Sequence, residues 1–293
     1  MNALGGVLML VASVLTPHAD CPADPFRAER ADFLAEMYPS QEFTAYVWDA
    51  ATGCVFSLNP DNRQQTASVF KVMVMAGALL EAQYEQRALS DYERGLIEPM
   101  ISESANGPVR GLWRLHGGAP WYTEQTTTFG LANTSVVGDY ELGWGRTTTS
   151  AADQVDLLRQ VLFRDFGPLH ESARAQAWGF MTDIAPDQRW GVGASAPPGS
   201  VVAQKNGFAG TVANSVGGVL RSDGTGYAMA VLSSGWSSWP AGVEVVDAIA
   251  GWINESLGPS PGRPLVPAPD RWSGVNSEVG LAQGLLGLAG LID

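Results

Sequence analysis

Strand-forming segments occur at two distant places in this sequence, with a long helix-rich stretch between them. Near the N-terminus, residues 43–48 and 54–58 read as two strands joined by a turn, which predicts a β-hairpin. Further strands, separated by glycine and Asp-Gly turns, are predicted at residues 201–205, 213–220 and 227–232. A sheet that uses all five strands must therefore be built from both ends of the chain.

The fold class that follows is α/β (α+β), with a five-stranded antiparallel sheet flanked by helices and a second, all-helical lobe. Residues 20–257 form this domain, in which residues 20–68 and 200–257 make the α/β lobe and residues 69–199 the helical lobe. Helices are predicted from apolar spacing at residues 25–37, 72–80, 151–162, 170–182 and 240–255. The boundary between the lobes, a usual place for a ligand cleft, lies between Ser68 and Lys205.

Two terminal segments stand apart from this domain. Residues 4–15 resemble the apolar core of a secretory signal, so residues 1–19 are predicted to be a signal peptide and the protein to be secreted or held in the cell envelope. The alternative is a buried N-terminal helix. Residues 258–293 begin with a proline- and glycine-rich linker and form a C-terminal tail without an assigned role.

Composition excludes several classes of function. The formal charge of −13 disfavours a nucleic-acid partner, because phosphates need a basic surface. The three histidines, His18, His116 and His170, do not cluster with other metal ligands, and no G-x-S-x-G elbow of a Ser-His-Asp hydrolase is present. We therefore expect a monomer that needs no metal or cofactor and acts on a small molecule.

The chain has two cysteines, Cys21 and Cys54. In an exported protein such a pair suggests one disulfide, here between the N-terminus and the predicted hairpin. The alternative is two unpaired thiols.

A serine and a lysine three residues apart mark the start of the first long apolar helix. Ser68 and Lys71 would share one helical face, so the amine could reach the hydroxyl and activate it as a base. The chain has fifteen arginines but only two lysines, Lys71 and Lys205. Because lysine can lose its proton and arginine cannot, a lysine in such a chain indicates proton transfer rather than surface charge.

Three short motifs follow one another in a set order: Ser-Val-Phe-Lys at 68–71, Ser-Ala-Asn at 104–106 and Lys-Asn-Gly at 205–207. They resemble the S-x-x-K, S-D-N and K-T-G motifs of the class A β-lactamases and the penicillin-binding serine peptidases. The resemblance covers residues 25–255 and implies that family's fold and acyl-transfer chemistry.

The resemblance also implies a role for each matching residue. Ser68 would be the acylated nucleophile, and Lys71 would take its proton. Ser104 would pass a proton to the leaving amide nitrogen, and Asn106 would orient Lys71 and the substrate amide. Without the resemblance, Ser104 and Asn106 would read as ordinary loop and helix-cap residues.

The third motif would contribute to substrate binding. Lys205 would add positive charge beside Ser104 and toward a substrate carboxylate, although a charge on an edge strand is the alternative. Asn206 and Gly207 would line the substrate site. The backbone N–H groups of Ser68 and Phe208 would form the oxyanion hole, which stabilises the negative charge on the attacked carbonyl oxygen.

The sequence departs from the family pattern at three points. Ala105 replaces the usual aspartate, and Asn206 stands where the family has a hydroxyl residue. Class A enzymes also place a deacylation glutamate well before the threonine-rich helix start, whereas the candidate here, Glu141, lies only six residues before Thr147. Glu141 is therefore expected to be an exposed loop carboxylate rather than the deacylation base.

Acylating residues without a clear deacylation base predict a serine acyl-hydrolase that reacts readily with β-lactams and turns them over slowly. A D-alanyl-D-alanine peptidase or an esterase, acting on a peptidoglycan-derived peptide or an ester, would use the same residues and remains an alternative. The alternative of another class is a non-catalytic protein that binds penicillin or cell-wall peptide. The retention of both lysines and Ser104 argues against it.

Overall fold

The structure is a computed structural model that describes residues 21–138, 143–163 and 166–258. The predicted signal peptide, the tail from residue 259 and Glu141 lie outside the described residues. Within those residues, no helix is long and apolar enough to span a membrane.

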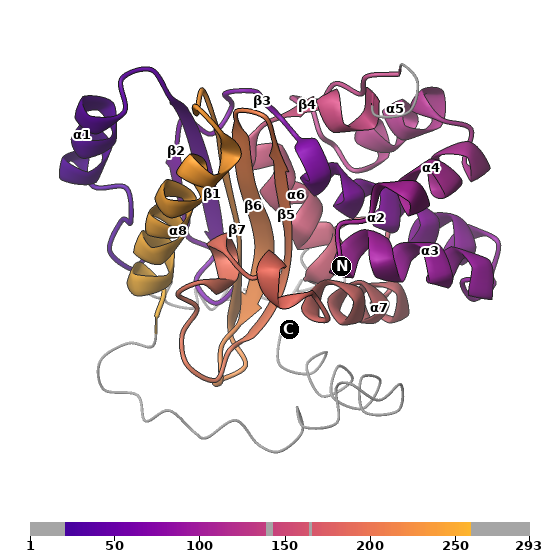
Figure 1. The fold of residues 1–293 in the computed structure, drawn as a ribbon. Coiled ribbons are helices and arrows are strands. Elements are labelled where there is room, and N and C mark those ends of the chain that lie inside the picture. The colour runs from indigo at the N-terminus through magenta and orange to yellow at the C-terminus, as the bar shows by residue number, and fades with distance from the viewer. Residues whose placement is uncertain (1–20, 139–142, 164–165, 259–293) are drawn as a thin grey trace, which may run out of the picture.

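Five antiparallel strands form the central sheet (Figure 1), in the order β2-β1-β7-β6-β5. The hairpin and the C-terminal strands meet where β1 pairs with β7, for example with Thr44 opposite Leu232. The predicted sheet of five strands is therefore confirmed. The strands are β1 Glu42–Asp49, β2 Val55–Leu58, β5 Val201–Ala209, β6 Val212–Leu220 and β7 Gly226–Ser234.

Helices cover both faces of the sheet, with α1 and α8 on one side and the helical lobe on the other (Figure 1). Strand β6 is buried along its whole length because it lies between these layers, which explains its nearly continuous apolar and small-residue sequence. The helices are α1 Ala28–Met37, α2 Phe70–Tyr84, α3 Asp91–Ser102, α4 Asn106–Leu115, α5 Ala119–Thr128, α6 Ala151–Leu162, α7 Glu171–Thr182 and α8 Trp239–Ser256.

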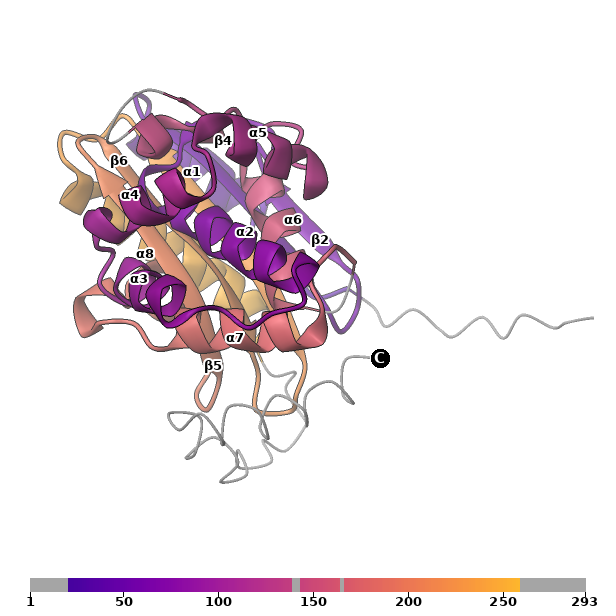
Figure 2. The ribbon, with the colours of Figure 1, turned by 90° about the vertical axis from the view of Figure 1, so that its right-hand side faces the viewer.

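Helix α2 runs through the centre of the helical side, with other helices around it (Figure 2). Residues 70–80 of this helix are all buried and, apart from Lys71, apolar or glycine, as expected for a segment without an exposed side. Helix α6 begins where predicted, because the Ser150 side chain accepts the Asp153 N–H at 3.1 Å. Residues 151–162 were expected in the helical lobe, and the structure packs α6 directly on β7 and β1 as well.

Short elements join these layers near α2. A two-stranded sheet pairs β3 Gln64–Gln65 with β4 Thr148–Thr149. This pairing had no sequence signal, because two residues are too few to show an alternating pattern. The 3₁₀ turns are η1 Ala67–Val69, η2 Gly143–Arg146, η3 Pro186–Gln188 and η4 Gly191–Gly193.

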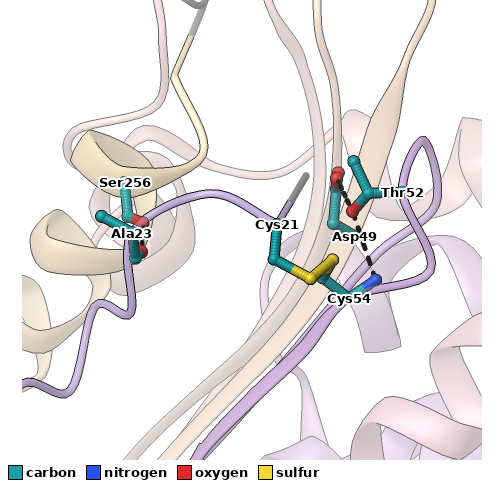
Figure 3. The surroundings of a disulfide bond; sticks show 6 residues. All are labelled: Cys21, Ala23, Asp49, Thr52, Cys54 and Ser256. Atoms are coloured by element: carbon teal, nitrogen blue, oxygen red, sulfur yellow. Dashed lines mark hydrogen bonds between the residues drawn. A yellow bond between two sulfur atoms is a disulfide. The ribbon is translucent and has the colours of Figure 1, made fainter. Parts of the chain in front are cut away.

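A disulfide between Cys21 and Cys54 ties the first described residue to the turn after β1 (Figure 3). The same turn is held by the Thr52 hydroxyl, which donates to Asp49 Oδ2 at 2.7 Å and accepts the Cys54 N–H at 3.2 Å. Nearby, Ser256 at the end of α8 donates to the carbonyl oxygen of Ala23. The N-terminal segment is thus fastened to β1, β2 and α8.

Candidate active site

Ser68 lies in the turn η1, directly before α2. Ala67 has a left-handed backbone with φ of 45°, a conformation that costs a non-glycine residue about 1–3 kcal/mol. Ser68 is partly exposed, whereas Ala67 and Val69 are buried. The turn therefore presents one hydroxyl at the N-terminal end of a buried helix, where unpaired N–H groups favour negative charge.

Lys71, one turn further along, is 0% exposed. Its Nζ donates to the Ser104 carbonyl oxygen at 2.5 Å, the Ser104 hydroxyl at 3.1 Å and Asn106 Oδ1 at 2.9 Å. Burial disfavours the ammonium form and lowers the pKa of Lys71 to about 7. A large fraction of such an amine is unprotonated at neutral pH, as a general base requires.

Ser104 joins α3 to α4 in a left-handed conformation with φ of 60°. In this conformation its carbonyl and its hydroxyl both accept from Lys71. Asn106 is the first residue of α4, so its side chain stands next to the same amine. Backbone strain at both Ala67 and Ser104 is a pattern typical of functional sites.

Strand β5 contacts the Ser68 turn through Gly207. A Cβ atom on Gly207 would lie 2.6 Å from the Thr66 carbonyl oxygen and 3.0 Å from the Ser68 backbone nitrogen. Only glycine therefore allows so close an approach. The N–H groups of Ser68 and Phe208, expected to form the oxyanion hole, thus belong to two segments in direct contact.

Asn214 of β6, a residue outside the three motifs, fixes this contact from the neighbouring strand. It lies opposite Gly207 and donates from Nδ2 to the carbonyl oxygens of Gln65 at 2.8 Å and Thr66 at 3.1 Å. Its Oδ1 accepts the Ser233 N–H at 3.0 Å. An asparagine inside an apolar strand was the available signal, because asparagine is disfavoured there.

Lys205 of β5 is also buried, at 1% exposure, and its Nζ donates to the Asn206 carbonyl oxygen at 3.0 Å. Burial, and then the charge of Lys71, lower the pKa of Lys205 well below its usual value, while Asp187 acts in the opposite direction. The two amines are therefore close enough to repel each other. Among the described residues, the lysine that donates to Ser104 is Lys71 and not Lys205.

Asn206 occupies the opposite face of β5, because side chains alternate along a strand. Its Nδ2 donates to the carbonyl oxygens of Gln188 at 2.8 Å and Trp190 at 3.0 Å, and the side chain is 0% exposed. These contacts commit the Asn206 amide N–H groups to the preceding loop. They leave no exposed donor at the position where the resemblance implied substrate binding.

Trp144 of η2 is a site residue without a sequence signal. The centroid of its ring lies 5.3 Å from Lys71 Nζ. By contrast, Glu141 lies outside the described residues, so its expected role stays a prediction. In the described ranges, no group of three or more His, Cys, Asp or Glu side chains could hold a metal ion.

A sequence model of the family described as "Beta-lactamase enzyme family" matches residues 25–92 and 93–257, which is most of the chain. This protein belongs to the β-lactamase enzyme family. It is accordingly a β-lactamase-like serine hydrolase. A search among curated proteins gave no match.

Solved structures in this group share the fold at low sequence identity. PBP-A has a TM-score of 0.68 and 19% identity, over 78% of this chain and 94% of its own. An ancestral (GNCA) class A β-lactamase has a TM-score of 0.69 and 20% identity, over 78% of this chain and 99% of its own. The resemblance to class A β-lactamases and penicillin-recognising proteins is confirmed.

Proposed function

We propose that this β-lactamase family member forms an acyl-enzyme on Ser68 with β-lactam-type amides and releases it slowly. The observation that carries the proposal is the group around Lys71. A buried amine with a pKa of about 7 lies one helical turn from a partly exposed serine and donates to the Ser104 hydroxyl at 3.1 Å.

The acylation step that we propose uses these groups. Neutral Lys71 takes the proton of the Ser68 hydroxyl as Oγ bonds to the carbonyl carbon of the substrate. The C–N bond then breaks, the Ser104 hydroxyl gives its proton to the leaving nitrogen, and the Lys71 ammonium replaces that proton. The N–H groups of Ser68 and Phe208 would bind the oxyanion, and losing one such donor typically costs about 3–4 kcal/mol of transition-state stabilisation.

Deacylation needs a water molecule and a base. Lys71 is neutral again after acylation, so it can take a proton from water and return it to Ser68 Oγ as the ester bond breaks. Slow release is expected because the candidate deacylation glutamate, Glu141, lies only six residues before Thr147, unlike the deacylation glutamate of class A enzymes. A penicillin G acyl-enzyme complex is known for a variant of PBP-A, a protein of the same fold, which supports a stable ester on this scaffold.

Mass spectrometry of the protein after exposure to penicillin tests this proposal. We expect a covalent adduct of the mass of the intact β-lactam, which disappears over a longer period. Ser68→Ala should abolish the adduct completely. Neither adduct nor turnover would end the proposal, and labelling of Ser68→Ala would identify another nucleophile.

An ester is the second candidate for the acyl donor. Position 206 has no hydroxyl, and the Asn206 N–H groups are committed to Gln188 and Trp190, which weakens recognition of a substrate carboxylate. Hydrolysis rates for nitrocefin, an acyl-D-Ala-D-Ala peptide and a simple ester on one preparation would rank the donors. A preference for the ester would replace the β-lactam as the natural class of substrate.

We also propose that the protein is exported to the cell envelope or beyond. The predicted signal segment and the disulfide both support an oxidising compartment. The N-terminal sequence of the protein recovered from the cell envelope or the medium tests this. An intact residue 1 on that protein would contradict cleavage.

A further inference from the structure

Trp144 adds an aromatic surface to the three oxygen contacts of Lys71. The Lys71 Nζ lies 5.3 Å from the centroid of the ring, within the distance of about 6 Å at which a cation is attracted to an indole face. Trp144 is 5% exposed and Lys71 0%. The ammonium is therefore enclosed by oxygen atoms of Ser104 and Asn106 and by one ring.

Hydrogen bonds fix Trp144 to the segment that carries the nucleophile. Its carbonyl oxygen accepts from the Thr147 N–H at 3.2 Å and the Thr66 hydroxyl at 3.5 Å. Thr66 N–H donates to the Thr147 carbonyl oxygen at 2.8 Å, and Gln65 Nε2 donates to the Gly145 carbonyl oxygen at 3.2 Å. Three hydrogen bonds thus join the backbone of residues 144–147 to the segment that leads into the Ser68 turn.

We propose that Trp144 is a positioning residue for the general base: its ring holds the Lys71 ammonium against Ser104 and Asn106 and keeps water from the amine, so that the acyl-enzyme is long-lived. The part of this inference that concerns the lifetime rests on the proposed function. The part that concerns the amine stands on the contacts alone.

Two opposing effects act on Lys71 at this point. The face of the indole stabilises the ammonium, whereas burial destabilises it. Burial lowers the pKa of Lys71, whereas the Lys71 charge and, in the opposite direction, Asp187 act on the pKa of Lys205 on β5. In the part of the chain that the structure describes, Nζ contacts Ser104, Asn106 and Trp144, and none of these has an acidic or basic side chain.

The amine can be followed directly, because the chain has only two lysines. Protein labelled with ¹³Cε-lysine should give two resonances, which Lys205→Met would assign. Trp144→Leu removes the aromatic face but keeps the amine dry, so we expect the titration midpoint of Lys71 to fall by at least about 0.4 pH unit. Trp144→Phe should restore most of the difference. An unchanged or raised midpoint in Trp144→Leu overturns the positioning role.

The lifetime is measured by pulse-labelling with penicillin and mass spectrometry. Trp144→Ala opens space for water beside the amine, and we expect the acyl-enzyme to decay at least about tenfold faster. If this variant does not fold, as circular dichroism will show, Trp144→Leu is judged by the same criterion. A lifetime unchanged from the wild type overturns this part of the inference.

A matched control comes from the opposite face of the sheet. Trp252 of α8 lies 5.1 Å from the Arg30 guanidinium in the same kind of contact. Trp252→Leu should leave the Lys71 midpoint and the acyl-enzyme lifetime at their wild-type values, and a change there would show a general effect of tryptophan loss. If the wild type forms no acyl-enzyme, the proposed function fails, while the titration still decides the role of Trp144.

Discussion

Lys71 and Lys205 are equally hidden from solvent, yet their ammonium groups have different surroundings. Lys71 donates to three oxygen atoms of Ser104 and Asn106, including a hydroxyl that can itself move a proton. Lys205 donates to a backbone carbonyl of its own strand. The difference indicates that the proton-transfer group is built on the helical side of the site, while β5 contributes charge and backbone.

The helical side and the sheet side of the site also differ in the backbone features that hold their residues in place. On the helical side, left-handed backbone occurs directly before Ser68 and at Ser104, whose carbonyl and hydroxyl both accept from Lys71. On the sheet side, Gly207 lets β5 touch the Ser68 turn, and Asn214 anchors that turn through two hydrogen bonds. We therefore expect the acylation rate to fall more when Lys71 on the helical side is replaced than when Lys205 on the sheet side is replaced.

The largest effect is expected from Lys71. Lys71→Met removes the base and should slow acylation by penicillin about 10³-fold or more. Lys71→Arg retains a cation that cannot accept a proton and should be nearly as slow. Stopped-flow labelling with a fluorescent penicillin measures both rates. If Lys71→Arg acylated within tenfold of the wild type, Lys71 would supply charge rather than a base.

A smaller effect is expected from Gly207. Gly207→Ala places a Cβ within 2.6 Å of a backbone carbonyl oxygen and must push β5 away from the Ser68 turn. The loss should be about 10²-fold in acylation rate, comparable to the loss of one oxyanion-hole donor. Gly95→Ala on α3, where a Cβ meets nothing within 4 Å, is the matched control and should acylate normally. Equal rates for both variants would show that the contact is not needed.

The smallest effect is expected from Lys205, and it is measured in the pH dependence of acylation. Acylation requires neutral Lys71, so its rate should rise with pH to a plateau above the Lys71 pKa of about 7. At pH 5 it should be roughly 100-fold below that plateau.

Because burial is the cause of the low pKa of Lys71, Lys205→Met should lower the plateau about tenfold and leave the midpoint of the profile near its wild-type value. A midpoint raised by a full pH unit would mean that the second amine, and not burial, sets the protonation state of Lys71.

Much of the fold could be predicted from local pattern. The strands and helix α6 lie where periodicity and the Ser150 cap placed them, and helix α1 starts only at Ala28. The five-stranded sheet was predictable because the two sets of predicted strands, at opposite ends of the chain, had no other strands with which to pair.

The site was predictable only where a motif carried it. Lys71, Ser104 and Asn106 meet as the resemblance implied. Trp144 had no sequence signal and Asn214 had only its unusual place in an apolar strand, because each acts through a contact between segments far apart in the sequence. Side chains alternate between the two faces of β5. This alternation places the Lys205 side chain, and not that of Asn206, on the face toward α2.

The burial of both lysines has a consequence for chemical modification. The chain has no lysines other than these two. The folded protein therefore has no lysine on its surface that an amine-directed reagent could reach. Acetylating or crosslinking reagents such as N-hydroxysuccinimide esters should therefore leave the native chain unmodified apart from its terminal amine. Their reaction with Lys71 or Lys205 would then report directly on how often the interior around the nucleophile opens.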